Sequence, residues 1–291
     1  MNRAATHSPT RLAAFSFIVS MIVLGVKAAA WWRTESVVLL ADTVESGLDG
    51  VTALVLFFAV TYSARPADDG HPFGHGKVEY FSAGFQGALV LMAGIGIGVR
   101  VVGSLLAGPR ALELSGGLPL SALATAINLG LAVTLIRAGR ALRSPALQAD
   151  GRHNATDVVT TIGGWVGLGL AWSTGWWVLD PLVAIAVAAQ ILWTGFGLVR
   201  SSVQGLMDAA LPERELRGLI AAFDRVLADR PAHYVRLRTR QSSQHAFVDL
   251  VLQVPGTMTV EASHTLCDAL EDAAQEVLHG AEVSIHVDPQ P

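Results

Sequence analysis

The stretch SVVLLADTVESGLDGVTALVLFFAVTY, residues 36–62, decides the fold of this chain. It has the length of a membrane-spanning helix, because about 20 mostly apolar residues cross the hydrocarbon core of a bilayer. Yet it contains three acids, Asp42, Glu45 and Asp49. An acid at mid-membrane costs about 2.5–3.5 kcal/mol on insertion scales. These carboxylates therefore need a cation, protons or water, and they indicate a functional site.

The overall composition agrees with a membrane protein. Of 291 residues, 52% are hydrophobic and only 15% are charged, which is less charge than soluble domains carry. The formal net charge is -4 and there is no long basic run, so the sequence gives no reason to expect a nucleic-acid partner. Cys267 is the single cysteine, which excludes an internal disulfide and a thiolate metal cage.

Six segments have the length and composition of membrane spans, and this predicts an all-α bundle in a lipid bilayer. They are residues 11–32, 36–62, 78–106, 118–138, 147–172 and 176–199. The N-terminal tail 1–10 carries Arg3 and is followed directly by Arg11, the connection 63–77 carries Arg65 and Lys77, and the connection 137–152 carries four arginines, whereas the opposite loops hold Arg33, Arg110 and almost no other basic residue. The positive-inside rule then places both termini in the cytoplasm, with the domain 11–205 in the cytoplasmic (inner) membrane.

The composition becomes soluble in residues 206–291, which we interpret as a cytosolic domain. LPERELRGLIAAFDRVLAD and VEASHTLCDALEDAAQEVL have helical periodicity, whereas VRLRTRQ, AFVDLVLQV and EVSIHVD alternate like strands. The order αββαβ predicts a small α+β domain with two helices on one face of a three-stranded sheet. So small a domain has a marginal core, and we therefore expect a homodimer in which a second copy covers part of it.

Four polar residues in two spans form a candidate transport site. Glu45 and Asp49 are four residues apart and share one helix face, and HNATD in the fifth span places His153 and Asp157 at the same spacing. If the two spans are in contact, one imidazole and three carboxylates form a four-coordinate site for a divalent transition metal such as zinc. The alternative is protonated acids and a structural His–Asp pair. Asp42 lies one turn away, outside this set.

A second candidate metal site lies in the loop RPADDGHPFGHGKVEY, residues 65–80. Asp68, His71 and His75 are close in sequence, and the intervening proline and glycines permit tight turns that bring both imidazoles to one ion. The alternative interpretation is a solvated polar loop.

Seven motifs in this chain resemble the cation diffusion facilitator family, in the expected order and over nearly the whole length. They are ESGLD, DDGHPFGHGKVE, HNATD, WWVLDPLVA, GLMDAALP, LRTRQS and IHVDP. The resemblance implies a homodimeric six-helix exporter that exchanges a divalent metal for protons, with a metallochaperone-like (ferredoxin-like) cytosolic domain. It implies a secondary active transporter rather than an enzyme, without a prosthetic group.

The resemblance also assigns residues. It implies that Glu45, Asp49, His153 and Asp157 form the transport site and that Asp68, His71 and His75 form the loop site. It matches Lys77 and Asp208 to an ion pair that links the membrane and cytosolic parts. The first ligand in the second span is usually Asp or His in this family, and here it is glutamate. That departure leaves Zn, Fe, Mn, Co and Cd open as the transported metal.

In the cytosolic domain, valines replace two histidines that the resemblance leads us to expect. These are Val235 in the first strand and Val251 in the second. His264, His286 and Asp288 remain at matching positions. His233 lies two residues before Val235 and can share its strand face, so we add it as a candidate ligand. With these valines, the residues are compatible with one, two or no metal ions in this domain.

Two other functions compete with transport. A membrane-anchored metal sensor would bind metal without moving it. An intramembrane metallohydrolase would also bury His and acids, but the sequence contains no HExxH motif and no GxSxG serine elbow. For an exporter, carboxylates and imidazole must lose protons to bind metal, so the sequence predicts metal and proton competing for one site.

Overall fold

The computed structural model describes residues 8–34, 37–107, 118–176 and 178–291. It divides into two compact units, Met1–Val203 and Gln204–Pro291.

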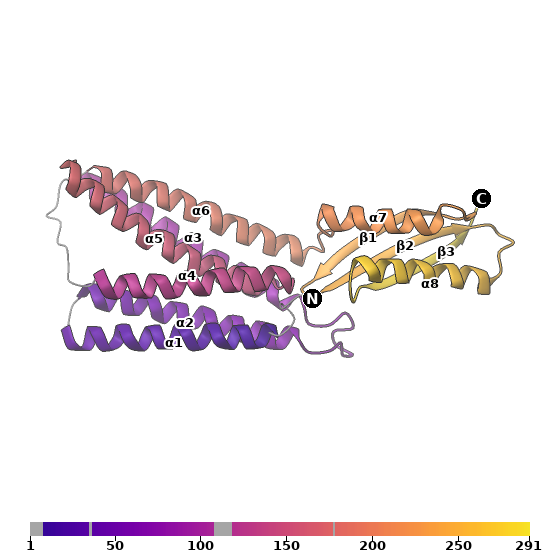
Figure 1. Ribbon diagram of the computed structural model, residues 1–291, viewed down its shortest axis with the longest axis horizontal. Coiled ribbons are helices and arrows are strands. Elements are labelled where there is room, and N and C mark those ends of the chain that lie inside the picture. Colours follow the sequence, from indigo (N-terminus) through magenta and orange to yellow (C-terminus); the bar gives the residue numbers. More distant parts are fainter. Residues whose placement is uncertain (1–7, 35–36, 108–117, 177) are drawn as a thin grey trace. The chain divides into compact units, whose positions relative to one another are not determined.

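The first unit is a bundle of long helices (Figure 1). They are α1 (Pro9–Thr34), α2 (Val37–Ser63), α3 (Val78–Ala107), α4 (Leu118–Ala141), α5 (Pro145–Thr174) and α6 (Leu179–Leu206). Within the described ranges, 5 helices are long and apolar enough to cross a membrane, namely α1, α2, α3, α4 and α6. Helix α5 falls outside this set because most residues of 148–157 in its first half are polar or charged, and its second half contains several glycines and threonines. The sixth span, at 147–172, therefore stays a prediction.

Helix α5 is nevertheless well defined at both ends. Ser144 is its N-cap in an extended conformation and accepts a hydrogen bond from the backbone N–H of Leu147, and Pro145 occupies the first helical turn. The helix ends at Gly175, which adopts the left-handed conformation with φ 74°. These caps fix where α5 begins, and with it the position of the HNATD motif.

A buried carboxylate joins three helices at the ends that flank the 64–77 loop. Glu79, in the first turn of α3, is 0% exposed. It accepts a hydrogen bond of 2.7 Å from the Ser63 hydroxyl at the end of α2, and another from the Ser144 hydroxyl at the N-cap of α5. Such partners are required because a buried carboxylate without hydrogen bonds is strongly destabilising. The loop with the predicted metal site is thus anchored at both ends.

Small residues let α3 and α6 approach closely. A Cβ atom added at Gly87 would lie 2.8 Å from the Leu198 Cβ and 3.0 Å from the Val199 backbone nitrogen. Gly195 of α6 is equally close to α3, with the Leu91 backbone nitrogen at 2.9 Å. Close packing of this kind drives helix association in a bilayer, where the hydrophobic effect does not.

We predict that Gly87→Ala destabilises the bundle by about 1–3 kcal/mol, because the added methyl group overlaps α6. The matched control is Gly96→Ala on the same helix, where an added Cβ has nothing within 4 Å. The control should be neutral or stabilising, since alanine favours helix by about 1 kcal/mol over glycine. Thermal unfolding of the purified protein in detergent measures both. Equal melting temperatures for the two variants would show that the α3–α6 contact is unimportant.

The second unit, Gln204–Pro291, is a small α+β domain. It contains α7 (Glu213–Leu227), β1 (His233–Ser242), β2 (His245–Val254), α8 (Val260–Val277) and β3 (Glu282–Pro289). The strands form one sheet in the order β1-β2-β3, with β1 antiparallel and β3 parallel to β2. The predicted three-stranded sheet is therefore present.

One face of this sheet carries the core. Alternate residues of β2, including Leu250 and Leu252, are packed with Phe223 of α7 and Leu270 of α8. The register shifts between Tyr234 and Arg236, so β1 bulges at the intervening residue. Both helices contribute to the single core, which leaves the other face of the sheet more open.

Candidate metal sites

Three side chains from two helices converge in the membrane unit. Asp49 of α2 and His153 and Asp157 of α5 each offer one ligand atom, and these atoms all lie within 4.8 Å of one another. The His153 Nε2 is 3.2 Å from the Asp49 Oδ1. The convergence arises because α2 and α5 are in contact and because His153 and Asp157 occupy one face of α5. The predicted meeting of the second and fifth helices is therefore seen for these three residues.

The fourth predicted ligand, Glu45, has its backbone in α2, one turn before Asp49. Its side chain lies outside the described residues, as does that of Asp42. Helical residues four positions apart share one face, so the Glu45 position lies on the face of α2 that carries Asp49.

The group is largely enclosed. The exposed fractions of the His153 and Asp49 side chains are 12% and 21%. The His153 Nδ1 is buried and has no hydrogen-bond partner in the described part of the chain. One ring nitrogen therefore faces the carboxylates, where a proton or a metal ion can bind.

A further buried carboxylate, that of Asp150, lies near this group. The sequence did not predict its burial. Asp150 is 1% exposed and lies one turn before His153 on α5. Its Oδ2 accepts a hydrogen bond of 2.7 Å from the Ser16 hydroxyl of α1. The spacing of three residues places Asp150 near the face of α5 that carries His153, which is the only sequence feature that could have indicated it. The contact with Ser16 of α1 shows that Asp150 faces the bundle interior. We regard Asp150 as a positioning residue that holds α5 against α1.

The loop group is assembled by a tight turn after α2. The ligand atoms of Asp68, His71 and His75 lie within 4.8 Å of one another. The two Asp68 oxygens are each 3.3 Å from an imidazole nitrogen, Oδ1 from His71 Nδ1 and Oδ2 from His75 Nε2. Gly74 between the histidines has φ 77°, a conformation that glycine adopts without strain. The sequence predicted this grouping.

The two imidazoles of the loop differ in environment. His75 is only 2% exposed in its side chain, whereas His71 is 56% exposed. The ring of Tyr62 on α2 contacts that of His75 edge-on, with the centroids 4.7 Å apart. The His75 imidazole is thus buried against α2, while His71 and Asp68 stay accessible to solvent.

Backbone donors hold Asp68 ionised. The N–H groups of His71 and Gly70 donate to its Oδ1, at 2.7 and 3.0 Å. The hydrogen bond from the His71 backbone, followed by the hydrogen bond from the His71 imidazole and the charge interaction with His75, lowers the pKa of Asp68 below its ordinary value. A carboxylate that is already ionised binds a cation without first losing a proton.

Comparisons with known proteins identify the family. Residues 13–207 match a model described as the cation efflux transmembrane domain, and residues 213–290 match one described as the cation efflux protein, cytoplasmic domain. This chain belongs to the cation efflux family. The predicted resemblance is therefore confirmed, and the chain is a metal-cation efflux transporter rather than an enzyme.

Individual relatives of this cation efflux protein cover almost its full length. An uncharacterized transporter of Synechocystis sp. is 41% identical over 95% of this chain and 89% of its own length. A protein named cation-efflux pump FieF from Klebsiella pneumoniae is 31% identical over 99% of this chain and 95% of its own. A solved structure of CzrB, described as a candidate zinc transporter, is 32% identical to this chain. The match covers 28% of this chain and 99% of the CzrB chain, with a TM-score of 0.27.

The four candidate metal ligands of the cytosolic domain, His233, His264, His286 and Asp288, do not form one group within a single copy of this cation efflux protein. Ile285 and Val287 of β3 face the core, so the alternate residues His286 and Asp288 lie on the opposite, open face of the sheet. These two contact each other, with His286 Nε2 2.9 Å from Asp288 Oδ1. His264, by contrast, lies on the helix side of the sheet.

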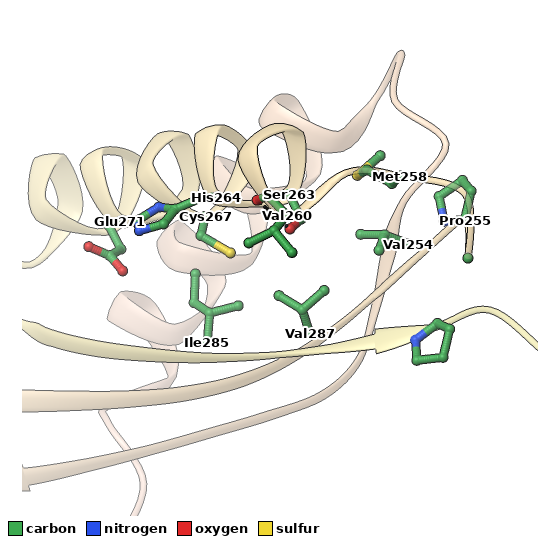
Figure 2. A pocket seen from close by; sticks show the side chains of 12 residues that line it. Val254, Pro255, Met258, Val260, Ser263, His264, Cys267, Glu271, Ile285 and Val287 are labelled. Atoms are coloured by element: carbon green, nitrogen blue, oxygen red, sulfur yellow. Dashed lines mark hydrogen bonds between the residues drawn. The ribbon is translucent and has the colours of Figure 1, made fainter.

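The surroundings of His264 show this separation directly. Figure 2 shows His264 on α8 on the same side of the sheet as Ile285 and Val287. All three residues line one pocket, whose volume is about 540 Å³. Its Nδ1 is 3.1 Å from Asp268 on its own helix. His233, the fourth candidate, begins β1 and pairs with Gln253 of β2. The cytosolic metal site therefore stays a prediction.

The predicted pair of Lys77 and Asp208 also stays a prediction, because the two residues belong to different units. Within the second unit, the Asp208 Oδ1 is 3.4 Å from the Arg240 Nη1.

We predict that Asp68→Asn lowers metal affinity at the loop by at least about tenfold, since even outer partners of metal ligands contribute that much. Asp69→Asn removes the same charge from the adjacent exposed residue, outside the group, and serves as the matched control. Calorimetric titration of each purified variant with Zn²⁺ gives the number of sites and their affinities. Loss of a site in both variants, or in neither, would show that the loop group does not bind metal through Asp68.

Proposed function

We propose that this transporter moves divalent transition-metal ions out of the cytoplasm in exchange for protons, by alternating access in a homodimer. The observation that supports this most is the enclosed group of Asp49, His153 and Asp157 between two long helices of the membrane unit. Ionisable residues at such a depth mark ion pathways and proton relays.

The donor set favours particular metals. It combines imidazole nitrogen with carboxylate oxygen, and the single cysteine, Cys267, lies in the other unit. Imidazole suits Zn and Fe, while carboxylates shift preference toward harder ions such as Mn. We therefore propose Zn, Fe or both as transported substrates, with Mn, Co and Cd as further candidates. Glu45 is the proposed fourth ligand.

Exchange with protons follows from the hydrogen bond in this group. With Asp49 ionised, the 3.2 Å contact requires a proton on the His153 Nε2. A metal ion that binds the same nitrogen requires that proton to leave. When the site opens to a more acidic exterior, protonation of the same atoms displaces the metal. The residues themselves therefore couple outward metal movement to inward proton movement.

The orientation and assembly belong to the same proposal. The segment 137–152, which runs from the end of α4 into α5, carries four arginines, and this favours a cytoplasmic position for it and for both termini in the inner membrane. The cytosolic unit is small and one face of its sheet is more open than the other. We propose that two copies associate and that their helices rock together between inward-open and outward-open states.

We predict that Asp49→Asn and Asp157→Asn each lower metal-driven proton flux by at least about tenfold, because each removes a charged ligand from the transport group. Asp69→Asn in the loop is the matched control and should keep the wild-type flux. Proteoliposomes that contain a pH-sensitive dye and are given a Zn²⁺ gradient report the flux. Normal flux in both variants contradicts the proposal. Metal binding without flux in the wild type would instead favour a sensor.

We also predict that Glu45→Asp narrows the range of transported metals. The shorter side chain reaches less far and constrains the geometry of the site, which favours tetrahedral zinc over larger ions such as Cd²⁺. The measurement is metal-dependent proton flux with Zn, Fe, Mn, Co, Cd and Ni in parallel, normalised to zinc. An unchanged profile in Glu45→Asp would show that this residue does not set selectivity.

A further inference from the structure

A separate polar pocket lies between α4, α5 and α6, away from both metal-ligand groups. Its volume is about 290 Å³. Its polar wall consists of Arg140, Arg152, Thr156, Gln190 and Thr194. In the sequence these two arginines indicate only the membrane orientation, and the proposed transport mechanism involves neither of them.

Positive charge dominates this pocket. Arg140 and Arg152 both line it, no acid is among its lining residues, and Arg152 is only partly exposed. Neither guanidinium has an ion pair or hydrogen bond within the described ranges of the chain. Arginine cannot release its charge, so the partly buried guanidinium of Arg152 is repelled by that of the exposed Arg140. An anion between them would relieve this repulsion.

The remaining groups select the kind of anion. The hydroxyls of Thr156 and Thr194 already donate to backbone carbonyls one turn earlier, at 2.9 and 3.0 Å, so their oxygens are left as acceptors. The donors on offer are therefore the two guanidinium forks and the Gln190 amide. Guanidinium forks match the geometry of phosphate oxygens and bind them bidentately.

We propose that this pocket binds a phosphate group, either the headgroup of an anionic phospholipid or free phosphate. Its position at the arginine-rich ends of α4 and α5 suits a lipid, because basic pockets between membrane helices on the cytoplasmic side bind such headgroups. That orientation rests on the proposed function, whereas the charge argument does not. Arg152 directly precedes His153, so a phosphate bound here neutralises charge next to the transport group.

The test uses the purified full chain in neutral detergent and does not depend on transport. Native mass spectrometry compares binding of phosphatidylglycerol with that of phosphatidylcholine carrying the same acyl chains, and a parallel titration with inorganic phosphate measures thermal stabilisation. We expect a clear preference for phosphatidylglycerol. We expect Arg140→Gln/Arg152→Gln to weaken its binding by at least about tenfold, the loss of two charge-assisted contacts.

Arg137→Gln is the matched control, since it removes the same charge from an exposed residue of α4 outside the pocket. If the double variant does not fold, Arg140→Gln alone is used, because that side chain is exposed and should lower affinity severalfold. Stabilisation by inorganic phosphate that is lost in the pocket variant but kept in Arg137→Gln would identify a free-anion site. Equal lipid binding in wild type, pocket variant and control, without stabilisation by phosphate, overturns the proposal.

Discussion

The contact between Asp49 and His153 is the interaction on which the proposed mechanism of the membrane unit depends. A carboxylate within a membrane helix is stable only when a proton, a metal ion or a hydrogen-bond donor compensates its charge. Here the donor comes from a different helix, at 3.2 Å, and Asp157 supplies a second carboxylate beside it. In the proposed mechanism the same atoms exchange the proton for a metal ion, so the interaction that stabilises this arrangement is also the one that a substrate must replace.

The rest of the first unit positions this contact. Ser144 and Pro145 fix the start of α5, while Glu79 joins the ends of α2, α3 and α5 through two hydroxyl groups. Asp150 holds α5 against α1 through Ser16. Buried polar groups of this kind are destabilising unless paired, and once paired they specify one arrangement of the helices. The loop with Asp68, His71 and His75 connects α2 and α3. The Glu79 contacts therefore anchor this loop as well as the start of α5.

The sequence could predict features that depend on spacing along one element. Helical spacing placed His153 and Asp157 on one face, and loop chemistry predicted the grouping of Asp68, His71 and His75, which the structure brings together. Features that depend on contacts between elements were not predictable. The pairing of Asp150 with Ser16 and the convergence of Arg140 and Arg152 on one pocket require knowing which helices are neighbours. In the cytosolic unit, strand alternation places His286 on the face opposite the core, but the layer that holds His264 became evident only from the fold.

The central claim is that metal and proton compete for the same atoms in the membrane unit. The most direct test is the number of protons released per metal ion bound, measured by calorimetric titration of Zn²⁺ in buffers of different ionisation enthalpy. The titrated protein carries Asp68→Asn, so that zinc binding at the loop does not contribute to the measured proton release. The account predicts release of at least about one proton per ion, lost when His153 is replaced by alanine. Zinc binding at this site without proton release would contradict it.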